Sequence, residues 1–258
     1  MFGSRRPLVF DAQRLRLPAG VWCWRRRALL LQFLGTVVAL GWISGDWAKL
    51  ATMAVFWAIG FGRLSPAEVT IAVVVDLLFV AMDEAALKQR IFAFRHPDVG
   101  GLPIYEYFLW GFYILHAVRF LGGPGGHPRR MLWALGLAAA FSLCFSTITN
   151  PLMLALTAGA VLVASLGIFH EPTDLAFTAY MAAMGMAVEY VGVATGQWSY
   201  PHAPLGGVPL WSFVMWCGVG IFSSRLLVPF LRKSPLPLHQ AATDSRTEPR
   251  SSAPPRVQ

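Results

Sequence analysis

Residues 82–121 read MDEAALKQRIFAFRHPDVGGLPIYEYFLWGFYILHAVRFL, and residues 188–227 read VEYVGVATGQWSYPHAPLGGVPLWSFVMWCGVGIFSSRLL. An offset of 106 positions aligns the two segments without a gap. The identical pairs are His96 and His202, Gly100 and Gly206, Gly101 and Gly207, Pro103 and Pro209, Trp110 and Trp216, and Arg119 and Arg225. The conservative pairs are Asp83 and Glu189, Phe92 and Trp198, Phe94 and Tyr200, and Tyr105 and Trp211. This agreement indicates an internal duplication.

The composition is typical of a membrane protein. Of the 258 residues, 56% are apolar and 13% are charged, and the mean hydropathy is +0.54. In soluble domains about a quarter of the residues are charged. Apolar runs of about 18 to 20 residues recur along the chain and lack the alternation of β-barrel strands. Because a span must satisfy its own backbone hydrogen bonds, we expect an all-α, polytopic membrane helical bundle.

The net charge of +8 comes from basic residues outside the apolar runs. Seven arginines lie within residues 1–27, and further basic residues lie within 232–256. This distribution is typical of the positive-inside rule and predicts the lipid bilayer, not nucleic acid, as the partner. We therefore expect a protein of the bacterial inner (cytoplasmic) membrane with both termini in the cytoplasm. Three cysteines, an odd number without metal-like spacing, argue against a disulfide framework.

The apolar runs predict about eight transmembrane helices arranged as two parallel four-helix repeats. An even number of spans per repeat gives both repeats the same orientation, with a pseudo-twofold axis along the membrane normal. The predicted spans are residues 28–44, 47–62, 66–87, 103–121, 131–149, 151–169, 172–195 and 209–230. The predicted domains are a basic cytoplasmic arm (1–27), a first repeat (28–121), a linker (122–130), a second repeat (131–230) and a disordered tail (231–258).

Two helix starts share one signature. Ser65 is placed as an N-cap, Pro66 as the first helical residue and Glu68 in the first turn. The pattern returns 106 positions later at Glu171, Pro172 and Asp174. At the other end of the repeat, the matched Arg119 and Arg225 are expected to reach the inner surface and snorkel there.

Charged residues in the spans point to a polar site. A charged side chain inside a bilayer is costly and usually faces a cavity or a partner. We expect Asp83, Glu189, His96 and His202 to converge on the pseudo-twofold axis near the outer leaflet. The aromatic residues expected there are Phe92, Phe94, Trp198 and Tyr200.

Each of these residues also has a simpler interpretation. Asp83 and Glu189 lie near helix ends and could be interfacial anchors. His96 and His202 precede Gly-Gly-x-Pro turns and could be surface capping residues. A metal site built from these four residues matches no known ligand spacing, so no cofactor is predicted.

Three further residues are candidates for ligand contact. Asp76 lies halfway along its span and has Ala182 as its counterpart. It could line a substrate site, or it could pair with Lys88 or a backbone donor. Trp110 and Trp216 are matched and lie two turns inside their spans, whereas most other aromatic residues are expected in the interfacial belt.

Residues 101–107, Gly-Leu-Pro-Ile-Tyr-Glu-Tyr, resemble the Pro-x-Glu-Glu segment of the lycopene cyclase domain of bacterial heterodimeric and fungal fused carotenoid cyclases. Gly196, Trp198 and Tyr200, with the Gly-x-Pro that follows, are similar to that family and to carotenoid hydratase-type membrane proteins. Residues 188–216 also resemble an uncharacterised bacterial integral-membrane family. The resemblance implies a protein of two homologous halves in which a carboxyl group protonates a double bond of a carotene.

The paired acids of the cyclase motif are only partly present. The first half has Tyr105-Glu106 at this position, and the second has Trp211-Ser212. Glu106 is therefore the residue to which the resemblance assigns the motif acid.

These observations support three functional hypotheses. The first is a cofactor-free enzyme in which Glu106, with Asp83 or Glu189, protonates a double bond of a polyisoprenoid, leading to a ring or an alcohol. The second is a proton-coupled transporter or lipid-binding protein with a central site between the halves. The third is a structural membrane protein without a site.

Overall fold

A computed structural model describes residues 19–122, 130–201 and 203–231 of the chain. These residues form an all-α bundle with one small two-stranded sheet. The helices are α1 (Ala19–Trp42), α2 (Asp46–Phe61), α3 (Pro66–Lys88), α4 (Glu106–Leu121), α5 (Met131–Thr147), α6 (Pro151–Ile168), α7 (Pro172–Ala194), α8 (Leu210–Leu226) and α9 (Val228–Leu231). The strands are β1 (Ala93–Phe94) and β2 (Trp198–Ser199).

Helix starts follow the predicted signals closely. The Ser65 hydroxyl accepts a hydrogen bond from the Glu68 amide, and Pro66 is the first residue of α3, so the predicted capping signature is confirmed. Asn150 caps α6 by accepting hydrogen bonds from two backbone amides of its first turn. Each cap satisfies donors that the first helical turn leaves without partners.

Two predicted boundaries differ from the structure. Helix α1 begins at Ala19, before the predicted span start at residue 28, so residues 19–27 of the predicted basic arm are helical; arginine and alanine favour the helical conformation. Helix α4 begins at Glu106, not at Pro103, because the chain turns there and the Glu106 amide donates to the Pro103 carbonyl over 3.1 Å.

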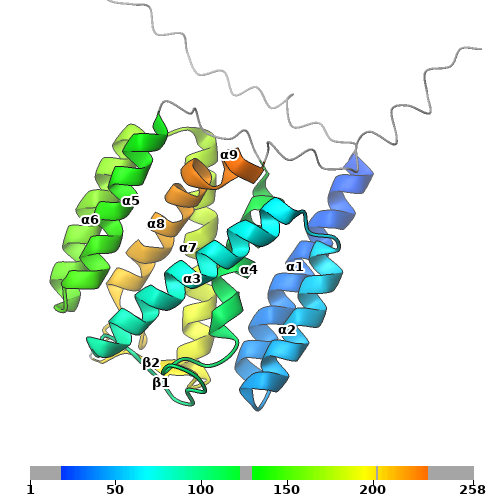
Figure 1. Cartoon of the computed structure of the whole chain (residues 1–258), viewed down its shortest axis with the longest axis horizontal. Helices are drawn as coiled ribbons and strands as arrows, with labels where there is room; N and C mark the ends of the chain where they lie inside the picture. The colour runs from blue at the N-terminus through cyan, green and yellow to red at the C-terminus, as the bar shows by residue number, and fades with distance from the viewer. Residues whose placement is uncertain (1–18, 123–129, 202, 232–258) are drawn as a thin grey trace, which may run out of the picture.

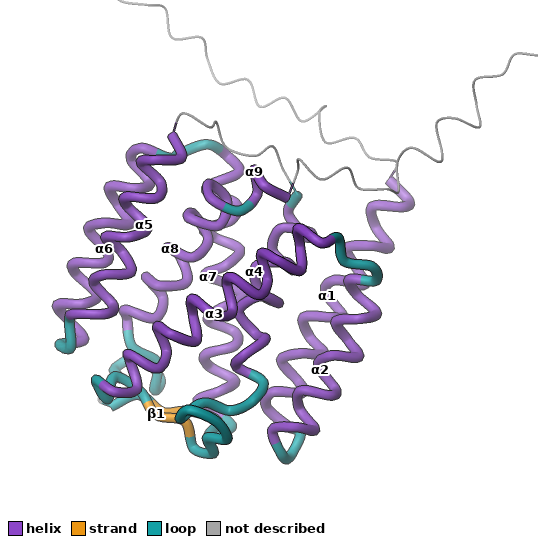
Figure 2. The backbone as a smooth tube through the Cα atoms, viewed as in Figure 1, coloured by secondary structure: helices purple, strands orange, loops and turns teal. Residues whose placement is uncertain are grey.

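The helices are arranged so that both strands lie at one end of the bundle. Figure 1 shows β1 and β2 at this end, and α9 and the beginning of α1 at the opposite end. Helices α7 and α8 pack against each other most extensively, and α3 packs along α4 while it crosses the face of the bundle obliquely (Figure 2). The core therefore lies around α4, α7 and α8, with α1 and α2 on one side and α5 and α6 on the other.

Duplicated residues meet each other at the strands. In the antiparallel pair, Ala93 is opposite Ser199, its own counterpart at an offset of 106 positions. Phe94 is opposite Trp198 in the same register. Antiparallel pairing between equivalent residues is the local arrangement that a pseudo-twofold axis produces. Strands this short were not predicted from the sequence.

Both matched arginines form ion pairs inside the bundle. Arg119 Nε donates to Glu68 Oε1 over 2.7 Å, joining the end of α4 to the start of α3. Arg225 makes the equivalent contact with Asp174, joining α8 to α7, and only 3% of Arg225 is exposed. The prediction that these arginines snorkel at the surface was wrong, because each has a carboxylate partner on the neighbouring helix.

The outer surface of the bundle is apolar. Helices α6 and α7 are long and apolar enough to cross a membrane, and α5 and α8 are apolar but shorter. The large apolar side chains exposed on α5 and α6 include Leu132, Trp133, Leu135, Leu143, Leu152, Met153, Leu156 and Val163. An apolar exterior of this extent is typical of lipid contact, so the chain is a helical membrane protein. The number of spans remains the sequence-based expectation.

Removal of the Asp174 carboxylate should destabilise the protein strongly. Asp174→Asn leaves the buried Arg225 guanidinium without its main partner, which costs about 3 to 5 kcal/mol. Glu171→Gln is the control, because the Glu171 side chain is 49% exposed and its loss should cost less than about 1 kcal/mol. Thermal unfolding of the detergent-solubilised variants measures both; equal transition temperatures would contradict the structural role of the Asp174–Arg225 pair.

Candidate functional site

Three acidic residues from three helices line one central pocket. They are Asp83 on α3, Glu106 on α4 and Glu189 on α7. The cavity volume is about 70 Å³. Its aromatic lining includes Phe79, Trp110, Tyr113, Trp198, Tyr200 and Trp216. The structure thus brings together the matched acids and the matched tryptophans that the duplication indicated.

Each matched acid accepts a hydrogen bond from the matched tryptophan of its own repeat. Trp110 Nε1 donates to Asp83 Oδ2 over 3.0 Å, and Trp216 Nε1 donates to Glu189 Oε1 over 3.1 Å. The two indole rings stack on each other with centroids 5.0 Å apart. Hydrogen bonds to a carboxylate stabilise its anionic form, so the stacked pair holds two carboxylates in fixed positions.

Glu189 has two further donors. Trp198 Nε1 donates to Glu189 Oε2 over 3.0 Å, and the Tyr200 hydroxyl donates to the same oxygen over 2.6 Å. Burial, followed by the charge of Glu189, raises the pKa of Tyr200 well above its ordinary value. Tyr200 therefore remains protonated and acts as a hydrogen-bond donor at all physiological pH values.

Glu106 differs from the other two acids. It is 7% exposed and lines the pocket, but its carboxylate has no hydrogen-bond partner among the described residues. The repeat offers no second copy, because its counterpart is Ser212. An acid that receives no donor is better suited to hold and deliver a proton than one that accepts three hydrogen bonds.

Sequence reasoning missed Tyr113 and Phe79, which line the pocket, and Gly185, which packs behind Trp216. Tyr113 lies on α4, and its buried hydroxyl has no hydrogen-bond partner in the part of the chain that the structure describes. Phe79 stacks on Trp110 with centroids 4.0 Å apart. Gly185 on α7 allows Trp216 to approach the backbone closely. The spacing of Glu106, Trp110 and Tyr113, at i, i+4 and i+7 of one helix, was the available signal for Tyr113.

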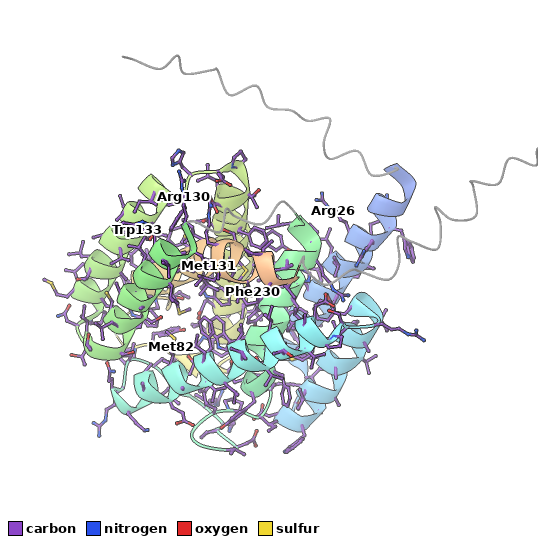
Figure 3. The ribbon with its side chains drawn as sticks, turned by 45° about the horizontal axis from the view of Figure 1, so that its top comes forward. Arg26, Met82, Arg130, Met131, Trp133 and Phe230 are labelled. Carbon is purple, nitrogen blue, oxygen red and sulfur yellow. The ribbon has the colours of Figure 1, made fainter. Side chains whose placement is uncertain are left out.

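Met82 on α3 lies between the pocket and the apolar side chains of α5 and α6. It lines the pocket from α3 and packs against the apolar cluster that α5 and α6 contribute to. Figure 3 labels Met82 on the side of α3 that faces α5. The pocket is thus lined on this side by a flexible apolar side chain.

Asp76 and the histidines lie outside the central pocket. Asp76 Oδ1 accepts a hydrogen bond from the Gly111 amide over 2.6 Å, which confirms the alternative of a backbone donor. Asp76 lines a second cavity, between α2, α3 and α4.

His96 is exposed, so its expected convergence on the site was wrong, and His202 lies outside the described residues. His96 recurs in the second repeat as His202 because each precedes a Gly-Gly turn, at Gly100 and Gly101 in the first repeat.

The described residues contain no cluster of three or more His, Cys, Asp or Glu that could hold a metal ion. The three carboxylates of the central pocket thus come from separate helices without forming such a cluster.

A second polar network connects three helices away from the pocket. His116 Nδ1 lies 3.1 Å from Gln32 Oε1, and His116 Nε2 lies 2.7 Å from the Tyr180 hydroxyl. These contacts join α4 to α1 and α7. Since His116 is fully buried, the network explains how its polar ring is accommodated in the core.

Replacement of Gly185 should disturb the site through Trp216. A Cβ atom at residue 185 would lie 1.9 Å from the Trp216 ring, so Gly185→Ala must displace the indole and weaken its hydrogen bond to Glu189. We expect a loss of stability of about 1 to 3 kcal/mol. Gly136→Ala on α5 is the control, because nothing lies within 4 Å of the added methyl group. Thermal unfolding with tryptophan fluorescence compares the variants; an unshifted transition in Gly185→Ala would contradict the close packing.

Comparisons with known proteins identify structural relatives only. No family model matches the chain, and a search of curated proteins found no match, so the resemblance to carotenoid cyclases has no support from these comparisons. The fold is similar to that of MvINS, a mycobacterial Insig homolog from Mycobacterium vanbaalenii, with a TM-score of 0.54 and 18% identity over 66% of this chain and 98% of that chain. A cross-linked trimer of MvINS gives a TM-score of 0.56, also with 18% identity, over 68% of this chain and 98% of that chain. The chain therefore shares a fold with an Insig homolog.

Proposed function

We propose that the chain is a membrane enzyme that binds the end of an isoprenoid-type ligand in the central pocket and protonates one of its double bonds from Glu106. The observation that carries this proposal is the unpartnered Glu106 carboxyl group beside two carboxylates that tryptophan donors hold in place. No metal or organic cofactor takes part in the proposed reaction.

The arrangement of the three acids supports Glu106 as the proton donor. In an apolar pocket, charge repulsion among three carboxylates is relieved when one of them holds a proton. Asp83 and Glu189 receive N–H donors, which favour their anionic forms. Glu106 receives none and is the member that fits the role of general acid.

The aromatic walls fit the cation that protonation of an alkene creates. Indole faces attract a positive charge through their quadrupole, most strongly where water is excluded. The stacked Trp110 and Trp216 rings lie beside the acids, and in the proposed reaction the Asp83 and Glu189 carboxylates add negative charge in the same pocket. Charge that is fixed before the reaction stabilises a developing cation without reorganisation.

The size of the pocket supports binding of a ligand end and not of a whole lipid. Sites that enclose a drug-sized molecule have volumes of about 300 to 1,000 Å³. With about 70 Å³, this cavity admits a small end group while the remaining chain extends between helices towards the bilayer. A long polyprenyl ligand meets this requirement.

The proposed context of the site follows from the duplication. Residues 28–121 and 131–230 form the two four-helix repeats, in parallel orientation in the inner membrane, with both termini cytoplasmic. The recurrence of the Glu68–Arg119 ion pair at Asp174 and Arg225 supports this organisation.

The second cavity favours an alternative function as a proton-coupled carrier or lipid-binding protein. This cavity has a volume of about 380 Å³, and Asp76 lies in a lining that is otherwise apolar, with Trp57 and Phe112 among its residues. Intramembrane carboxylates in such positions are typical of proton relays. Vesicles that contain the protein should then take up the carrier's substrate in response to a proton gradient. Loss of this uptake in Asp76→Asn would favour the carrier over the enzyme.

Glu106→Gln should abolish turnover while the protein remains folded. A strain that accumulates an acyclic carotene should change its pigment when it expresses the wild-type chain, and pigment analysis by chromatography should show no conversion with Glu106→Gln. Glu84→Gln on α3 is the control, because Glu84 does not line the central pocket. Unchanged pigment with well-expressed wild-type protein, or full conversion by Glu106→Gln, would refute acid catalysis at this residue.

A further inference from the structure

The pocket contains a second polar group that the proposed proton donor does not account for. The Tyr113 hydroxyl is buried, lines the pocket and has no hydrogen-bond partner among the described residues. Only 2% of Tyr113 is exposed. A buried hydroxyl left without a partner costs about 1 to 3 kcal/mol, so its presence calls for a partner that the protein does not supply.

Helix geometry directs Tyr113 towards Glu106. The two residues are seven positions apart on α4, which places them on the same face, about two turns apart. Side chains on a helix lean towards its N-terminus, so the Tyr113 ring extends back towards the turn that carries Trp110 and Glu106. The Tyr113 ring makes edge-to-face contacts with the two indoles of the pocket, with centroids 6.0 Å from Trp110 and 5.3 Å from Trp216.

We propose that Tyr113 and Glu106 form an oxygen-binding subsite, in which a hydroxyl group of the ligand or a water molecule lies between the Tyr113 hydroxyl and the Glu106 carboxyl group. This inference rests on the proposed function of the pocket and specifies its ligand as oxygen-bearing. A hydroxyl oxygen both accepts and donates, so it can satisfy the two unpartnered groups together. A cavity of about 70 Å³ has room for it, since one water needs about 10 to 15 Å³.

Only the first repeat carries this subsite. The counterparts of Glu106 and Tyr113 in the second repeat are Ser212 and Val219, which cannot reproduce an acid and a phenol. The proposed pair of Glu106 and Tyr113 therefore comes from α4, without a matching pair at the equivalent positions of α8, and gives an entering ligand one preferred orientation. A hydrocarbon end would leave the Tyr113 hydroxyl without a partner.

The subsite also defines a balanced reaction when its oxygen belongs to water. Glu106 gives its proton to one alkene carbon, and the alkene π electrons form the new C–H bond. The water oxygen then forms a C–O bond to the cationic carbon. The proton that this water loses returns to the Glu106 carboxylate, so the alkene and water become an alcohol with the enzyme unchanged. Tyr113 acts as a positioning residue that holds the attacking oxygen.

The first arm of the test measures binding and needs no turnover. Full-length protein in lipid nanodiscs is titrated with geranylgeraniol and with the hydrocarbon that carries a methyl group in place of its CH₂OH group. We expect the wild type to bind the alcohol about tenfold more tightly, the effect of one hydrogen bond to a buried group, and Tyr113→Phe to lose this preference. Tyr190→Phe, at an exposed tyrosine of α7, should retain it.

The second arm identifies water as the source of the oxygen. Protein is incubated with an acyclic carotene in water labelled with ¹⁸O, and products are analysed by mass spectrometry. Incorporation of ¹⁸O by the wild type, with a shift to oxygen-free products in Tyr113→Phe, assigns the subsite to water. An alcohol preference in the first arm that Tyr113→Phe removes assigns it to the ligand hydroxyl.

The oxygen subsite is overturned if the wild type binds both probes equally and any product lacks ¹⁸O, or if Tyr113→Phe behaves as the wild type in both arms. Failure of the proposed function gives a different result, namely that the wild type forms no product from the carotene or that Glu106→Gln still converts it. Circular dichroism and thermal unfolding of Tyr113→Phe establish that the variant is folded before either arm is interpreted.

Discussion

The burial of carboxylates in an apolar bundle is the constraint on which the rest of the structure depends. An isolated charge in a low-dielectric interior is too costly to persist without partners. Indole N–H groups from Trp110 and Trp216 reduce this cost for Asp83 and Glu189, and the two indoles stack on each other between the repeats. The same requirement applies at the opposite end of the bundle, where arginines neutralise Glu68 and Asp174.

Equivalent positions have diverged where the pocket is formed. Phe79 covers Trp110 in the first repeat, whereas its counterpart Gly185 allows Trp216 to lie directly against the α7 backbone. Along the same face, Glu106 stands where the second repeat has Ser212. The two repeats thus share their helices, but the proposed proton donor is present in the first repeat and not at the equivalent position of the second.

Several features could be predicted from the sequence because they depend on local signals. Proline and cap residues set the start of α3, and the offset of 106 positions indicated that Asp83 and Glu189 lie together. The ion pairs also had a signal that was not used, because both partners recur at that offset. Tyr113 was missed for the opposite reason, since its counterpart is Val219 and a search for repeated residues passes over it.

Backbone geometry explains why His96 was a misleading candidate. Its neighbours Gly100 and Gly101 have φ angles of 59° and 88°, a left-handed conformation that favours glycine, and Gly206 and Gly207 repeat it at 61° and 89°. The repeated segment around His96 therefore preserves a turn. Repetition alone does not separate a residue needed for chain geometry from one needed for chemistry.

The pairing of Ala93 with Ser199 has a consequence for the origin of the protein. In a chain with a single repeat, this strand would have to pair with the same strand of a second molecule, and a pocket between equivalent helices would be complete only in a homodimer. Joining the two copies in one polypeptide replaces that bimolecular encounter with an intramolecular one at a high effective concentration. It also frees each copy to mutate separately, which no symmetric dimer of identical chains permits.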